Sequence, residues 1–115
     1  MLTYSVAIRT LGKNPEVLKR ELESVSQQSL QPDKVVIYIA EGFERPSFQV
    51  GKEEYVWVKK GMVAQRALEY REIDSDVILM LDDDVELAPD SAEKMLRAMD
   101  EHGMDRVAAD TFKNQ

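Results

Sequence analysis

The stretch that decides the fold is VILMLDDD, residues 77–84, in which five apolar residues run directly into three aspartates. A short, continuous apolar run is typical of a strand that is covered on both faces, as strands of a parallel sheet are. Residues 35–39, VVIYI, form a second run of this kind, and residues 2–8 show a shorter strand pattern. The acidic turn is therefore expected at the carboxyl end of a buried strand.

Helix patterns alternate with these strands. The sequence NPE at residues 14–16 suits a helix start, because proline is preorganised for the first helical position and the acid favours the positive end of the helix dipole. A second helix is predicted to open at Gly61 and to extend its apolar face to Ile73, and a third is predicted to follow Asp90. Further strands are predicted at residues 55–58, which include Trp57 as a core residue, and at 106–109.

The resulting order is strand, helix, strand, strand, helix, strand, helix, strand. Such alternation predicts one three-layer α/β domain over residues 1–115, with a mostly parallel sheet and helices on both faces. Ligands bind beyond the carboxyl ends of the strands in sheets of this kind. Three candidate positions fall there: residues 9–10, Glu41 and residues 82–84.

Composition narrows the classes of function. The chain has 115 residues, no cysteine, one histidine and a net charge of −7 at pH 7. These counts exclude disulfides, thiolate metal sites and multi-histidine zinc sites. The acidic charge argues against a protein that grips nucleic acid through its phosphates. It leaves open a nucleotide whose diphosphate is joined to carboxylates by a divalent cation.

Residues 1–115 show no pattern typical of a membrane helix or a signal peptide. No apolar run approaches the roughly 20 residues that a membrane-spanning helix needs. Residues 1–5 lack the basic region and apolar stretch of a signal peptide. We therefore expect a cytoplasmic domain, which would be associated with a membrane only through a longer parent protein.

The three adjacent aspartates, residues 82–84, favour a hard divalent cation. Like charges side by side repel, and oxygen ligands without histidine or cysteine suit Mg²⁺ or Mn²⁺. Side chains of consecutive strand residues point to opposite faces, so Asp82 and Asp84 would share a side and Asp83 would not. A turn would break this alternation, so the pattern leaves the choice of ligand open. A solvated loop that leads into a helix is the other interpretation.

Taken in order, these motifs resemble glycosyltransferase family 2, whose members have the GT-A fold. The resemblance covers nearly the whole chain, and its pieces lie at residues 5–10, 18–28, 35–42, 61–66, 77–84 and 89–90. It implies the transfer of a sugar, with inversion, from a UDP- or GDP-sugar to an acceptor, assisted by Mn²⁺ or Mg²⁺. In one departure from the family pattern, Arg9 stands where proline is usual.

The resemblance also implies a set of site residues. Arg9 and Thr10 would lie against the nucleoside, and Glu41 would contact the base. Asp83 would contact the ribose, and Asp84 would ligate the metal. The positions implied for nucleotide-sugar binding are Arg9, Thr10, Glu41, Arg66, Asp82 and Asp83, and those implied for the metal are Asp84 and Asp82.

The catalytic base of the family is expected beyond residue 115, in an acceptor-binding half. The chain therefore resembles a truncated domain that by itself transfers sugar poorly or not at all. The oligomeric state stays open, and a dimer is compatible with the sequence. Two other functions also stay open: a non-catalytic nucleotide- or metal-binding module, and a phosphatase of the haloacid dehalogenase type, whose motif residues 82–86 match only loosely.

Overall fold

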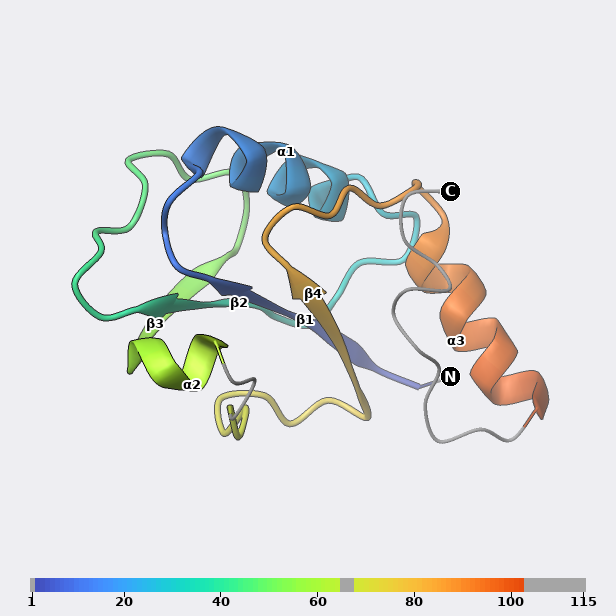
Figure 1. Cartoon of the computed structure of the whole chain (residues 1–115). Helices are drawn as coiled ribbons and strands as arrows, with labels where there is room; N and C mark the ends of the chain where they lie inside the picture. Colours follow the sequence, from blue (N-terminus) through green and yellow to red (C-terminus); the bar gives the residue numbers. More distant parts are fainter. Residues whose placement is uncertain (1, 65–67, 103–115) are drawn as a thin grey trace.

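The computed structural model describes residues 2–64 and 68–102, which form a four-stranded parallel sheet with helices on both faces (Figure 1). Its strands lie in the order β3-β2-β1-β4, and each neighbouring pair is parallel. This confirms the predicted α/β class. The elements are β1 (Tyr4–Thr10), α1 (Pro15–Ser26), β2 (Val35–Ala40), β3 (Glu54–Val58), α2 (Lys60–Ala64), β4 (Val77–Asp82) and α3 (Ser91–His102).

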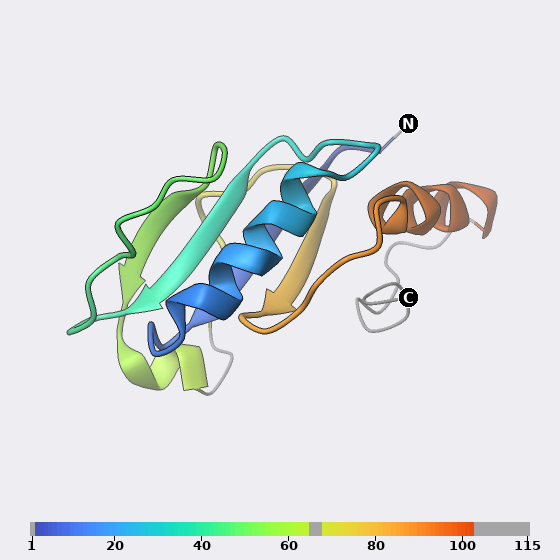
Figure 2. The ribbon, with the colours of Figure 1, turned by 90° about the horizontal axis from the view of Figure 1, so that it is seen from above.

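The central strand, β1, lies between β2 and β4, which brings three carboxyl ends to one edge of the sheet. In this register Thr10 lies opposite Ile39 of β2, and Arg9 lies opposite Asp82 of β4. Figure 2, which views the molecule from above, shows α1 running across the sheet and α3 to one side of it. The parallel arrangement therefore places the end of β1 directly beside the acidic turn.

Alternating strand residues build two hydrophobic clusters, one on each face of the sheet. The larger cluster joins β1 and β4 to the apolar faces of α1 and α3, which explains why both helices are amphipathic. Its most buried members are Tyr4, Val6, Ile8, Leu18, Leu22, Val25, Ile37, Leu79, Leu81, Ala92, Met95, Leu96 and Met99. The smaller cluster consists of Ala7, Val36, Tyr38 and Ile73. All six residues of β2 are buried, as predicted for a strand covered on both sides.

The second helix does not extend as far as its apolar pattern predicts. It covers Lys60–Ala64, and the chain from residue 68 to Ile73 is not helical. Tyr70 adopts φ 55°, and its ring packs edge-on against Tyr38 at 5.4 Å between ring centroids. Packing against the sheet thus fixes a left-handed residue where periodicity alone favours a helix. The predicted strand at 106–109 lies outside the described residues.

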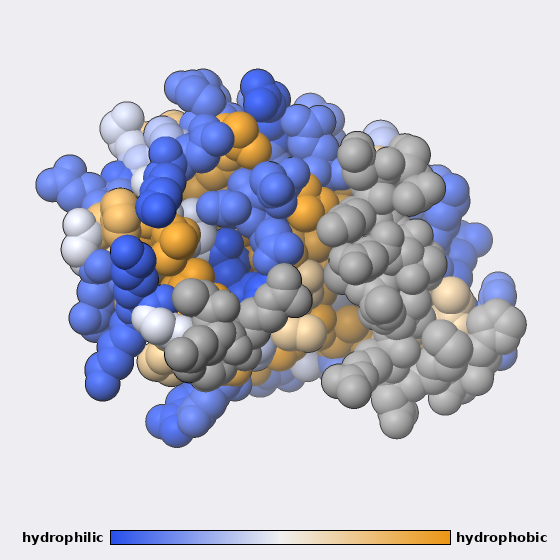
Figure 3. All heavy atoms as spheres, viewed as in Figure 1, coloured by the Kyte–Doolittle hydropathy of each residue, from blue (hydrophilic) through white to orange (hydrophobic). Residues whose placement is uncertain are grey.

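Trp57 is exposed rather than part of the core, so the prediction for this residue is wrong. It has 44% relative exposure, and its indole Nε1 donates to the Phe43 carbonyl at 2.9 Å. The cause is its position on β3, which is an edge strand of the sheet that residues 2–64 and 68–102 form. Figure 3 shows hydrophilic side chains over much of one face, with smaller apolar patches between them. Within residues 2–64 and 68–102, no helix could cross a bilayer.

Candidate functional site

The acidic turn begins where β4 ends, and it is fastened to α1 by side chains of that helix. Asp83 and Asp84 form the turn itself. The Val85 amide donates to Glu21 Oε1 at 3.4 Å, and the Leu87 amide donates to Ser24 Oγ at 3.0 Å. Helix α1 therefore supplies side-chain acceptors for two backbone amides of this segment, and these contacts fix the path of the chain after the aspartates.

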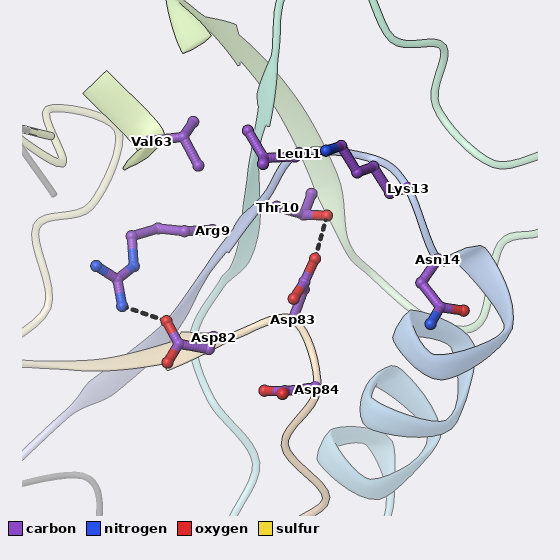
Figure 4. A pocket seen from close by; sticks show the side chains of 9 residues that line it. All are labelled: Arg9, Thr10, Leu11, Lys13, Asn14, Val63, Asp82, Asp83 and Asp84. Carbon is purple, nitrogen blue, oxygen red and sulfur yellow. Dashed lines mark hydrogen bonds and ion pairs between the residues drawn. The ribbon is translucent and has the colours of Figure 1, made fainter. Parts of the chain in front are cut away.

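The first two aspartates point to opposite faces of the sheet and meet the last two residues of β1 (Figure 4). Asp82 Oδ1 accepts from Arg9 Nη2 at 2.6 Å, and Asp83 Oδ2 accepts from the Thr10 hydroxyl at 2.7 Å. Thr10 also accepts from the Gly12 amide at 2.9 Å. Asp82 is the last residue of β4 and Asp83 begins the turn, so these two contacts decide an orientation that the sequence left open.

A pocket of about 490 Å³ opens between the acidic turn and the start of α1 (Figure 4). This volume lies in the range of small-molecule sites. One side carries the three carboxylates, and the other carries Lys13 and Asn14, the residue that precedes α1. A helix N-terminus attracts anions through its free amides and its dipole. The residues that line the pocket are Arg9, Thr10, Leu11, Lys13, Asn14, Val63, Asp82, Asp83 and Asp84.

Asp84 is the carboxylate best placed to receive a cation. Its side chain is exposed, and it forms no hydrogen bond or ion pair with another residue in 2–64 or 68–102. Within the same described ranges, no three histidine, aspartate or glutamate side chains converge as a ready-made metal cage. Mg²⁺ is commonly held by one or two carboxylates together with substrate phosphates and water. The oxygen donors present therefore fit Mg²⁺ or Mn²⁺ that arrives with a phosphate-bearing ligand.

Glu21 is a buried acid behind the turn. It has 0% relative exposure, and its second oxygen, Oε2, has no hydrogen-bond partner. Burial raises the pKa of Glu21 to about 9; the Val85 amide opposes this shift, and the three aspartates add to it. The carboxyl group is therefore protonated at neutral pH, which spares the turn a fourth negative charge.

The pocket unites most of the residues that the sequence singled out. Arg9, Thr10 and residues 82–84 all line it. Glu41 follows β2 directly and is exposed, but it does not line this pocket. Arg66 lies outside the described residues. The roles given to all of these residues stay predictions.

Sequence reasoning missed three residues around the pocket. Lys13 and Asn14 follow β1, and the rule that ligands bind beyond strand ends could have found them. Glu21 falls at helical spacing among apolar residues of α1, so its place on the buried face was visible in the sequence.

Thr10→Val is expected to lower the free energy of unfolding by about 1–2 kcal/mol, because it removes the partner of the half-buried Gly12 amide and of an Asp83 carboxylate oxygen. Thr3→Val is the matched control. Thr3 also accepts from an amide and donates to a carboxylate, both of Asp76, but it is exposed at the other end of the sheet. Urea unfolding of both variants measures the difference. If both variants lost the same free energy of unfolding, the Thr10 contacts would stabilise the fold no more than the exposed Thr3 contacts do.

Comparison with known proteins identifies the family. The family model described as glycosyl transferase family 2 matches residues 54–115. The crystal structure of S. aureus TarS is similar to this chain with a TM-score of 0.68 and 13% identity, over 89% of this chain and 20% of TarS. At this identity the likeness shows the fold, and the chain spans about a fifth of TarS. No curated protein matches the chain. Because the family model covers more than half of the sequence, the chain belongs to glycosyl transferase family 2.

Proposed function

We propose that this chain forms the donor site of a glycosyltransferase, which binds a nucleotide-diphosphate sugar together with Mn²⁺ or Mg²⁺. The observation that carries the proposal is the pocket at the carboxyl ends of β1 and β4, in which three aspartates face Lys13 and the start of α1. A diphosphate with a bound cation carries both negative and positive charge. It matches a pocket with carboxylates on one side and a cationic side on the other.

Each charged residue of the pocket has a proposed part in donor binding. Asp84 ligates the cation, with Asp82 as the second candidate ligand. Lys13 and the amides at the start of α1 attract the phosphates, while Asp83, held by Thr10, is directed to the ribose. A bound divalent cation would neutralise the charge that develops on the departing diphosphate. Arg9, Glu41 and Arg66 stay proposed nucleotide contacts.

The reaction itself needs a carboxylate that takes the proton from the acceptor hydroxyl. We assign this role to none of the three pocket carboxylates, because each already has a proposed part in donor binding. The chain by itself is therefore proposed to bind the donor rather than to complete the transfer. Transfer of the sugar is a property that we propose for the whole protein.

A thermal-shift experiment tests the proposal. UDP or GDP at about ten times its Kd should raise the Tm by roughly 5 °C when Mn²⁺ is present. The same nucleotides in EDTA should give little change, because the carboxylates repel a diphosphate that lacks its cation. UMP is the matched control, since it carries the same nucleoside as UDP but a single phosphate.

Two results would contradict the proposal. If UDP raised the Tm as much in EDTA as in Mn²⁺, nucleotide binding would not require a cation. Equal stabilisation by UMP and UDP would mean that the diphosphate is not recognised. A non-catalytic binding module would give the same binding result, so a sugar-transfer assay of the whole protein separates the two functions.

A further inference from the structure

The buried side of α1 carries a stripe of three polar side chains, Glu21, Ser24 and Gln28. Their spacings of three and four residues place them on one face of the helix. Glu21 and Gln28 are 0% and 4% exposed, and Ser24 is half-buried. Burial of a polar group costs free energy unless the group finds a partner, whereas an apolar side chain packs without that cost. The polar stripe therefore needs an explanation other than core packing.

Two members of the polar stripe bind the backbone that follows the acidic turn. Glu21 Oε1 accepts from the Val85 amide at 3.4 Å. Ser24 Oγ accepts from the Leu87 amide at 3.0 Å. Val85 and Leu87 also bury their side chains in the larger hydrophobic cluster, but apolar contact is non-directional. Hydrogen bonds have preferred angles, so the polar stripe fixes the orientation of the peptide groups in this segment.

The position of Asp84 is set through its backbone. Its side chain is exposed, and within the described part of the chain it forms no hydrogen bond or ion pair with another residue. On one side, its neighbour Asp83 is held by the Thr10 hydroxyl at 2.7 Å. On the other side, its neighbour Val85 is held by Glu21. The direction in which the Asp84 carboxylate points therefore depends on both of these contacts.

We propose that Glu21 and Ser24 are positioning residues for the cation site, because they hold the turn so that the Asp84 carboxylate faces the pocket. The inference rests on the proposed function, which gives Asp84 its part as a metal ligand. Removal of a group that orients a metal ligand typically weakens metal binding by about ten- to a hundredfold. Burial raises the pKa of Glu21 to about 9, so an uncharged replacement leaves the charge of the site unchanged at neutral pH.

The experiment measures Mn²⁺ binding without nucleotide, by electron paramagnetic resonance of the free ion. The double variant Glu21→Met with Ser24→Ala removes both acceptors, and it should bind Mn²⁺ at least about tenfold more weakly than the wild type. Ser24→Ala alone, the milder change, should weaken binding by a smaller factor, so the result does not depend on the folding of one variant. Glu21→Gln keeps an oxygen for the Val85 amide and should bind Mn²⁺ as the wild type does.

Hydrogen exchange gives a second readout that needs no metal. The amides of Val85 and Leu87 should exchange faster in the double variant than in the wild type, because they lose their side-chain acceptors. Glu21→Gln should keep the Val85 amide protected.

Gln28→Met is the matched control within the polar stripe. Gln28 Nε2 donates to the Ala88 carbonyl at 2.7 Å, and its Oε1 accepts from the Ala92 amide at 3.0 Å. It therefore holds the same segment at the start of α3 rather than beside Asp84. Its replacement should lower the free energy of unfolding, because buried backbone groups lose their partner, but it should leave the affinity for Mn²⁺ unchanged.

Several results would overturn the inference. Unchanged Mn²⁺ affinity in the folded double variant would show that the two contacts do not position a ligand. An equal loss of affinity in Gln28→Met would mean that the polar stripe acts through general stability alone. A wild-type chain that binds no Mn²⁺ without nucleotide would leave no cation site to position. Failure of the proposed function looks different: the wild type would then bind no UDP with Mn²⁺, whatever these variants do to the binding of the metal.

Discussion

Glu21→Gln is expected to gain stability over the wild type as pH rises, by up to about 1.4 kcal/mol for each pH unit between pH 5 and 8. The physical reason is the buried carboxyl group, whose pKa is raised from 4.5 to about 9 in the folded chain. Glutamine has the same shape but carries no titratable proton. The variant therefore removes a pH-dependent penalty and keeps an oxygen that can accept from the Val85 amide.

The sign of the effect follows from proton binding. Above pH 4.5 the unfolded chain releases the Glu21 proton, whereas the folded chain keeps it up to about pH 9. The contribution of this group to stability is therefore fully present below pH 4.5, and it is lost as the pH rises towards 9. Only the wild type has this titrating group, so only its free energy of unfolding falls through Glu21 as the pH rises. The difference in stability between Glu21→Gln and the wild type must therefore widen with pH.

Urea unfolding at pH 5, 6, 7 and 8 measures this difference. Glu23→Gln is the matched control, since Glu23 lies on the same helix but is exposed to solvent. A constant difference between wild type and Glu21→Gln across the series would show that Glu21 does not carry a raised pKa. A difference in stability that narrows as the pH rises would contradict the raised pKa of Glu21.

The layered fold could be predicted because its signals are local. The continuous apolar runs at 35–39 and 77–81 mark strands, and the NPE sequence at 14–16 marks the start of α1. Only β2 is buried throughout; in β4, which was predicted to be covered on both faces, Met80 is 44% exposed. Two other local predictions were wrong for reasons that involve the whole sheet. Tyr70 leaves the helical conformation because its ring packs on Tyr38, and Trp57 is exposed because β3 lies at the edge.

The site was predictable in position but not in its pairings. The sequence places residues 9–10 and 82–84 at strand ends, and the pocket brings them together. That Arg9 meets Asp82 and Thr10 meets Asp83 depends on the register of β1 and β4, which no pattern within either strand specifies. The burial of Glu21 behind the turn likewise depends on how α1 packs on the sheet.

Asp84→Asn should remove most of the metal-dependent affinity for a nucleoside diphosphate. The change takes away one charge and the carboxylate that is least engaged by its neighbours. It also relieves repulsion between adjacent aspartates, so the free energy of unfolding should not fall. A loss of binding in a fully folded variant would then be a loss of ligation. Asp100→Asn, an equal change of charge at an exposed position on α3, is the matched control.

Calorimetric titration of UDP into wild type and Asp84→Asn, each saturated with Mn²⁺ and again in EDTA, measures the link between cation and diphosphate. We expect the Kd for UDP to rise at least about tenfold in Asp84→Asn with Mn²⁺, which is about 1.4 kcal/mol of binding free energy. In EDTA, wild type and Asp84→Asn should both bind UDP weakly, with no such deficit in the variant. Equal affinity of wild type and Asp84→Asn in Mn²⁺ would contradict the claim that a cation joins this acidic turn to the donor.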